Sequence, residues 1–149
     1  MSNLLKNKED IIKWLDRNKI ENYTLIENTE YGYVVDVEGY VDLSNKKLLR
    51  IEVKFNKIKG SFYCNRNQLE TLEGAPLAVG GIFDCSYNKL TSLDGAPLEV
   101  GRNFFCHKNP QLGEYQNMTN FNEIKALLEK DKLSHHLIIP EIKSIINKL

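Results

Sequence analysis

The most chemically reactive side chains in this sequence are three cysteines, Cys64, Cys85 and Cys106, spaced 21 residues apart. A thiolate can bind zinc or act as a nucleophile, but structural zinc sites typically pair cysteines about two to four residues apart. A spacing of 21 residues instead gives each cysteine the same position in a repeat. We therefore expect three buried, neutral thiols that pack in the interior, with no metal site and no disulfide bond.

The histidines are the next candidates for chemistry. His107 is predicted to lie at an outward position of a strand, and His135-His136 lie in a polar segment between predicted helices. Neither site has a serine, cysteine or carboxylate partner at the spacing of a known catalytic motif, so we expect no catalytic residues. A small enzyme that uses His107 beside Asp84 or Cys106 is the least favoured hypothesis.

The composition is that of an ordinary globular protein: 149 residues, 42% hydrophobic and 27% charged. Twenty basic residues balance twenty acidic ones, which argues against a nucleic-acid binder that acts through a broad positive field. No apolar run approaches the roughly 20 residues of a membrane-spanning helix, and the N-terminus lacks the apolar core of a signal peptide. With an odd number of cysteines, these features favour the cytoplasm, without membrane association and without a cofactor.

The 21-residue spacing extends to other residue types. It links the members of five further sets: Phe62, Phe83 and Phe104; Asn67, Asn88 and Asn109; Leu69 and Leu90; Leu72 and Leu93; Gly60 and Gly81. Two copies share Gly-Ala-Pro-Leu-x-Val-Gly, at 74–80 and 95–101. A degenerate copy precedes them from Gly39, and a last copy decays after Asn109. The array therefore predicts about four coils over 39–112, stacked into a solenoid with a shared core.

Each copy also predicts its own local structure. The alternation in Phe83-Asp84-Cys85 predicts a short strand, and Ser86-Tyr87-Asn88 predicts the turn after it. We expect the amides of the asparagine set to pair with backbone groups of the neighbouring coil. From Phe83 onward the spacing matches the leucine-rich-repeat core, in which each coil adds one strand to a parallel sheet. Segment 79–97 is similar to the short leucine-rich repeats of bacteria and bacteriophages, and the resemblance covers 39–112.

The resemblance implies an α/β solenoid, whose end coils need covers. We expect one compact domain made of an N-terminal cap at 1–38, the repeats at 39–112 and a C-terminal cap at 113–149.

Helices are predicted in both caps. The first follows Asn7, with Ile11, Trp14 and Leu15 on one face, and a strand is expected within 22–38. In the C-terminal cap, helices are predicted after Asn122 and over 140–148. A role of the C-terminal helices in partner binding is the alternative to a simple cap.

The outward side chains of the strands carry the main functional prediction. If Phe62 and Cys64 face inward, the residues between them lie on the exposed, concave side of the sheet. The predicted protein-binding residues on this face are Tyr40, Asp42, Tyr63, Arg66, Ile82, Asp84, Tyr87, Phe105, His107 and Lys108. Exposed aromatic residues beside arginine are typical of protein interfaces. The sequence therefore predicts a non-enzymatic module that binds another protein.

The resemblance to bacteriophage repeats implies a partner inside an infected bacterium. The chain is expected to bind and to modulate or inhibit a host protein, for example a defence component. The alternative is binding to nucleic acid or ribonucleoprotein through exposed tyrosines and the cations Arg66, Lys89, Arg102 and Lys108. That alternative predicts an affinity that falls steeply with salt concentration.

Overall fold

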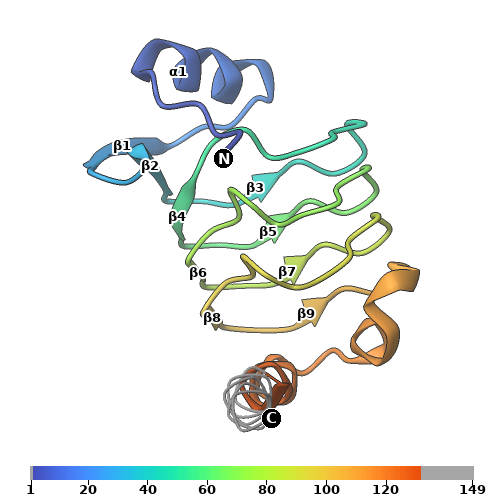
Figure 1. Ribbon diagram of the computed structural model, residues 1–149. Coiled ribbons are helices and arrows are strands. Elements are labelled where there is room, and N and C mark those ends of the chain that lie inside the picture. The colour runs from blue at the N-terminus through green and yellow to red at the C-terminus, as the bar shows by residue number, and fades with distance from the viewer. Residues whose placement is uncertain (1, 132–149) are drawn as a thin grey trace, which may run out of the picture.

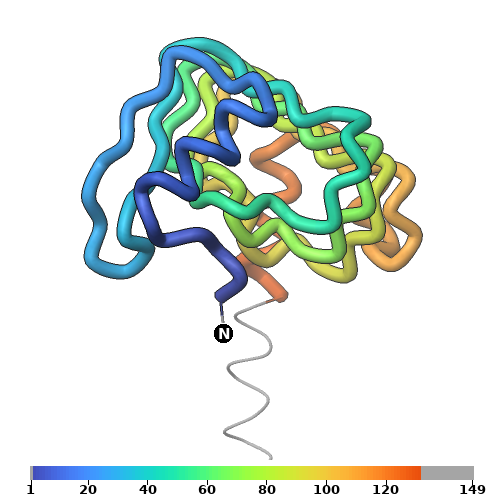
Figure 2. Tube along the Cα trace, turned by 90° about the horizontal axis from the view of Figure 1, so that it is seen from above, coloured from blue at the N-terminus to red at the C-terminus, as the bar shows by residue number. Residues whose placement is uncertain are grey.

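A computed structural model describes residues 2–131 and shows a β-solenoid of about three turns (Figure 1). Strands pair in parallel with strands 21 residues further along the chain, as in the register of Val41 with Phe62 and of Phe62 with Phe83. Four short strands form one sheet: β3 (Val41–Asp42), β5 (Phe62–Tyr63), β7 (Phe83–Asp84) and β9 (Phe104–Phe105). Seen from above, successive turns lie on top of one another (Figure 2).

A second sheet has five strands and covers another side of the coils. Its strands are, in spatial order, β1 (Tyr23–Asn28), β2 (Gly32–Val37), β4 (Phe55–Ile58), β6 (Ala78–Val79) and β8 (Glu99–Val100). β1 and β2 form an antiparallel hairpin, and β2 pairs in parallel with β4. The strand predicted within 22–38 is therefore present and joins the solenoid.

The repeat spacing predicted one strand per coil, whereas the coils contribute strands to two sheets. The second strand lies in the return segment after Gly-Ala-Pro, where the Leu98 N–H donates to the Leu77 oxygen at 2.8 Å. β6 and β8 were not predicted because each is two residues long and the flanking glycine and proline are typical of turns. The last predicted copy forms β9, and the chain then enters the 3-10 segment η1 (Pro110–Asn117).

Phenylalanine rings form a continuous column through the interior of the solenoid. The ring centroids of Phe62 and Phe83 are 5.7 Å apart, and those of Phe83 and Phe104 are 5.1 Å apart. The column is extended at its ends by Phe55, Trp14 and Phe121. Cys64, Cys85 and Cys106 are also fully buried, so the predicted inward positions are confirmed.

The asparagine set forms a ladder between consecutive coils, as predicted. Asn88 Oδ1 accepts a hydrogen bond from the Leu69 N–H at 3.0 Å, and its Nδ2 donates to the oxygens of Cys64 and Cys85 at 3.0 Å. Asn67 and Asn109 make equivalent bonds one coil away. The side-chain amide thus satisfies backbone groups that the tight turns leave without strand partners.

Helix α1 (Lys8–Arg17) lies at one end of the stack (Figure 1). Asn7 Oδ1 accepts hydrogen bonds from the Glu9 and Asp10 N–H groups at 2.9 and 3.2 Å, so the predicted start of the helix is confirmed. The predicted inner face, formed by Ile11, Trp14 and Leu15, is buried. The ring of Trp14 meets Phe55 edge-on at 6.3 Å, which joins the helix to the aromatic column.

At the other end of the stack, residues 121–131 are helical. This helix follows Asn120, whose Oδ1 accepts from the Glu123 N–H at 3.2 Å, so the predicted start at Asn122 is wrong by two residues. The earlier start places Phe121 in the first turn, where its ring packs against Phe104. The helix predicted over 140–148 and His135-His136 lie outside the described residues. In the part of the chain that is described, no helix has the length and apolar character needed to cross a membrane.

Candidate protein-binding surface

The outward side chains of β3, β5, β7 and β9, together with the turns that follow these strands, form the surface that we call the strand face. Its central file comprises Asp42, Tyr63, Asp84 and Phe105, which occupy equivalent positions one coil apart. Tyr63, Asp84 and Phe105 are partly exposed, while their neighbours in sequence, Phe62 and Cys64, are buried. The alternation that the sequence predicted is therefore present, and Tyr63 and Phe105 reach the surface.

Four side chains of the strand face contact one another across three coils, and we call them the aromatic cluster: Arg66, Tyr87, Phe105 and His107. The Arg66 guanidinium lies over the Tyr87 ring, 4.1 Å from its centroid. The Tyr87 ring meets His107 edge-on at 5.3 Å, and His107 meets Phe105 edge-on at 6.2 Å. Such contacts hold flexible side chains in defined positions, so the cluster presents a cation and three rings with little freedom left to lose on binding.

The backbone of Arg66, Tyr87 and Lys108 adopts the left-handed conformation, with a positive φ. Their φ angles are 56°, 55° and 56°, and Asn45, the equivalent residue of the first coil, has a φ of 55°. Non-glycine residues in this left-handed region cost about 1–2 kcal/mol each, and the region favours glycine. A turn was predicted at Ser86-Tyr87-Asn88, but its left-handed residue was not, because arginine, tyrosine and lysine rarely adopt a positive φ. Large side chains at strained positions are common at functional sites.

The two aspartates of the central file bind their own turns. Asp84 Oδ1 accepts hydrogen bonds from both the N–H and the hydroxyl of Ser86, and Asp42 Oδ1 accepts the same two bonds from Ser44. One carboxylate oxygen of each residue therefore fixes the turn after its strand. Sequence analysis predicted both aspartates as partner contacts, and the structure adds this local role.

The remaining predicted binding residues are distributed over the same surface. Tyr40 precedes β3 and is 67% exposed, and Tyr87 is 38% exposed. Ile82 is half-buried, and its N–H is held by Ser61 Oγ at 2.9 Å. Lys108 is exposed in the turn after β9. The ten residues therefore belong to one face, with Tyr40 at the end near α1 and Lys108 at the end near η1.

The cations of the nucleic-acid hypothesis are divided between two places. Arg66, Lys89 and Lys108 are exposed in the turns that follow β5, β7 and β9. Arg102 precedes β9, so it lies at the opposite end of that strand from Lys108. Only three of the four cations therefore share an edge of the molecule.

The three cysteine thiols are buried, and burial disfavours the reactive thiolate form. Burial raises the pKa of Cys64 and of Cys85 well above the ordinary value of a thiol, and it raises the pKa of Cys106 to about 11. The Cys106 thiol also donates to the Tyr115 oxygen at 3.0 Å. These are free, protonated thiols. Within residues 2–131, no group of three or more histidine, cysteine or acidic side chains is arranged to hold a metal ion.

His107 packs between two aromatic rings of the strand face. Its ring contacts Tyr87 and Phe105. One carboxylate oxygen of Asp84 accepts from the Ser86 hydroxyl, and the buried Cys106 thiol donates to the Tyr115 oxygen.

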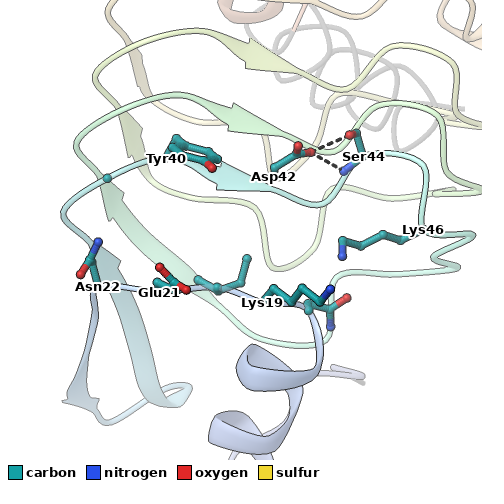
Figure 3. Close-up of a pocket in the computed structure, with 10 residues that line it drawn as sticks. Lys19, Glu21, Asn22, Tyr40, Asp42, Ser44 and Lys46 are labelled. Atoms are coloured by element: carbon teal, nitrogen blue, oxygen red, sulfur yellow. Dashed lines mark hydrogen bonds between the residues drawn. The ribbon is translucent and has the colours of Figure 1, made fainter.

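Two cavities were not predicted from the sequence, because each is lined by segments that are distant in sequence. One, of about 410 Å³, lies between residues 18–22 and the first coil (Figure 3). The other, of about 310 Å³, lies between the last coil and the helix at 121–131, where Leu98, Phe104 and Leu128 are among the lining residues.

Comparison with known proteins adds no relative: no protein-family model matches the chain, and no curated protein or solved structure matches it significantly.

Proposed function

We propose that this chain is a non-enzymatic binding module that recognises another protein through the strand face. The observation that supports the proposal is the aromatic cluster, in which Arg66, Tyr87, His107 and Phe105 are mutually packed on a stacked scaffold. Tyrosine and arginine are enriched among the residues that contribute most to binding energy at protein interfaces. Because these side chains are already ordered, association with a partner costs less conformational entropy than at a surface of free side chains.

The repeats support a more specific assignment of the fold and of the partner. We assign the chain to the short leucine-rich-repeat solenoids, with four units and with helices as caps, on the basis of the 21-residue spacing and the asparagine ladder. The similarity of segment 79–97 to bacteriophage repeats supports a viral role in the host cytoplasm. The partner is then a host protein, such as a defence component, whose activity the chain modulates or inhibits.

The test is capture of partners from a lysate of the native host with a variant that removes three rings, Tyr63→Ala with Tyr87→Ala and Phe105→Ala. The matched control replaces three exposed residues on the side of the five-stranded sheet, Lys57→Ala with Lys59→Ala and Glu99→Ala. We expect the control to retain partners that the ring variant loses, with both proteins folded by circular dichroism. Retention of every partner by the ring variant would contradict the proposal.

The position of Arg66, Lys89 and Lys108 along one edge, with Tyr87 between them, favours nucleic acid as the second candidate. Binding to phosphates releases counterions, so the affinity would fall steeply as salt rises from about 50 to 200 mM. A protein partner bound mainly through rings predicts a shallow dependence instead. Absence of binding to single-stranded RNA and DNA at low salt removes this candidate.

A further inference from the structure

The four-stranded sheet has one covered edge and one open edge. At β9, the Phe104 N–H donates to the Thr119 oxygen at 3.1 Å, so the chain itself occupies that edge. At β3, the N–H groups of Val41 and Leu43 donate toward β5, to the oxygens of Ser61 and Tyr63. Because successive residues of a strand alternate, the Asp42 N–H and C=O point to the other side. No strand within residues 2–131 pairs with β3 on that side.

Other parts of the first coil are covered by the N-terminal region. β2 pairs with β4, and the Leu5 N–H donates to the Glu52 oxygen at 2.7 Å. The glycines that open successive coils show the same contrast. A Cβ on Gly60 would approach the Gly39 oxygen at 3.0 Å, whereas a Cβ on Gly39 would meet nothing within 4 Å. The β3 side of the first coil therefore has open space beside Gly39.

The cavity of about 410 Å³ occupies this space. It is bounded on one side by Gly39, Tyr40, Asp42 and Ser44 and on the other by residues 18–22 (Figure 3). Residues 18–22 precede 39–43 by 21 positions, so they stand where a preceding coil would supply a strand. They do not pair with β3, and the cavity separates the two segments. The gap is thus placed where an additional strand would continue the sheet.

The two ends of the cavity carry opposite charges. Lys19 and Lys46 lie at the end where β3 finishes, while Glu21 and Asn22 lie at the end where it begins (Figure 3). The carboxylate of Asp42 accepts hydrogen bonds from Ser44, and within residues 2–131 neither Lys19 nor Lys46 forms an ion pair. A peptide that runs parallel to β3 would bring its C-terminal carboxylate to the lysines and its N-terminal ammonium toward Glu21.

We propose that the open edge of β3 binds an extended peptide as an additional parallel strand, with its free C-terminal carboxylate between Lys19 and Lys46. Main-chain hydrogen bonds to the Asp42 N–H and C=O supply the affinity, as in strand addition to other exposed sheet edges. This site uses backbone groups and the lysine pair rather than the aromatic cluster. Its failure is therefore distinguishable from failure of the proposed function.

The test follows amide hydrogen exchange of the full chain by NMR, with a mixed-sequence library of tetrapeptides at about 1 mM total as the probe. Free-acid peptides should slow exchange of the Asp42 amide at least about tenfold, while the amides of Val41 and Leu43, already bonded, change little. C-terminally amidated peptides should protect Asp42 at least about tenfold less, because they lack the anion. Equal protection by both libraries, or none by either, would overturn the proposal.

Two variants and a matched control sharpen the test. Lys46→Ala should lose most of the protection, whereas Lys47→Ala, which removes an adjacent lysine outside the cavity, should not. Gly39→Leu places a side chain in the open space and should abolish protection while the fold is retained. If the Asp42 amide is already protected without peptide, and more so at higher protein concentration, the edge is occupied by a second copy and the peptide proposal fails.

Discussion

A single buried amide in each coil has several backbone partners, so the asparagine set links turns as well as strands. Asn88 bonds to four groups drawn from its own coil and the preceding one: the Leu69 N–H and the oxygens of Cys64, Cys85 and Ser86. Replacement by a hydrocarbon side chain leaves the buried Leu69 N–H without a partner. The oxygens of Cys64, Cys85 and Ser86 lose one bond each but still accept from Asn67 Nδ2, Asn109 Nδ2 and the Arg66 N–H, respectively. The sequence pattern alone indicated this role, because asparagine recurs at 67, 88 and 109 beside buried leucines.

We predict that Asn88→Ala lowers the free energy of unfolding by about 3 kcal/mol, since one unsatisfied buried N–H costs roughly 1–3 kcal/mol and three further hydrogen bonds are lost. Asn103→Ala is the matched control, because Asn103 is exposed. It should change the free energy of unfolding by less than about 0.5 kcal/mol. Both values come from urea denaturation, and equal effects of the two substitutions would refute the ladder.

The buried thiols make stability depend on alkaline pH. The pKa of Cys85 is raised in the folded chain, so the folded state keeps a proton that the unfolded state releases above pH about 9. Stability from this group is complete below that pH and is lost as the pH rises. Between pH 8 and 10, the wild type should lose about 1.4 kcal/mol more than Cys85→Ala does. Parallel losses in urea titrations of the two proteins would show that the thiol ionises when folded.

At the scale of the coil, glycine sets how closely the turns stack. A Cβ on Gly80 would lie 2.2 Å from the Lys59 oxygen, and one on Gly101 would lie 2.1 Å from the Gly80 oxygen. These distances are far below van der Waals contact, so a side chain there would force adjacent coils apart. The Gly-Ala-Pro-Leu-x-Val-Gly motif therefore ends in glycine for a steric reason.

We predict that Gly80→Ala lowers the free energy of unfolding by about 2–3 kcal/mol, as is usual for overpacking. Gly39→Ala should be neutral or stabilising by up to about 1 kcal/mol, because its Cβ would meet nothing and alanine restricts the unfolded chain. Thermal denaturation followed by circular dichroism compares the two. Tolerance of alanine at Gly80 would contradict the coil spacing.

The positive φ angles in the turns after the strands predict that glycine at these positions increases stability. Lys108 has a φ of 56°, so Lys108→Gly should raise the free energy of unfolding by about 0.5–1 kcal/mol. Lys89→Gly, in the neighbouring turn but without a positive φ, should lower it by about the same amount. Urea denaturation distinguishes the two outcomes, and a loss of stability in Lys108→Gly would mean that the side chain supports the fold rather than the surface.

Much of the fold could be predicted because a period of 21 residues fixes which residues are neighbours in space. The burial of the phenylalanine and cysteine files and the start of α1 at Asn7 followed from that period and from local capping. The contribution of β6 and β8 to a second sheet did not, since a two-residue strand has no detectable alternation. The contact of Arg66 with Tyr87 and the cavity beside β3 could not be predicted from the period either. Both depend on side-chain positions in neighbouring segments, which the period does not specify.

At the scale of the whole molecule, an aromatic column connects the two ends. It begins at Trp14 of α1, continues through the phenylalanine file and ends at Phe121 of the last helix. Such a stack is a stable platform, since every coil buries its apolar face against the next. The strand face lies along this platform, and the proposed partner would be selected there by ring contacts, since the balanced charge of the chain provides no strong long-range attraction.

The most direct test of the central claim is site-specific photocrosslinking in a lysate of the proposed bacterial host. A benzoylphenylalanine replaces Tyr63 on the strand face in one protein and Lys57 on the five-stranded sheet in another. We predict a crosslinked protein partner from position 63 and none from position 57. Crosslinking from position 57 alone, or equally from both positions, would contradict the assignment of the strand face as the binding surface.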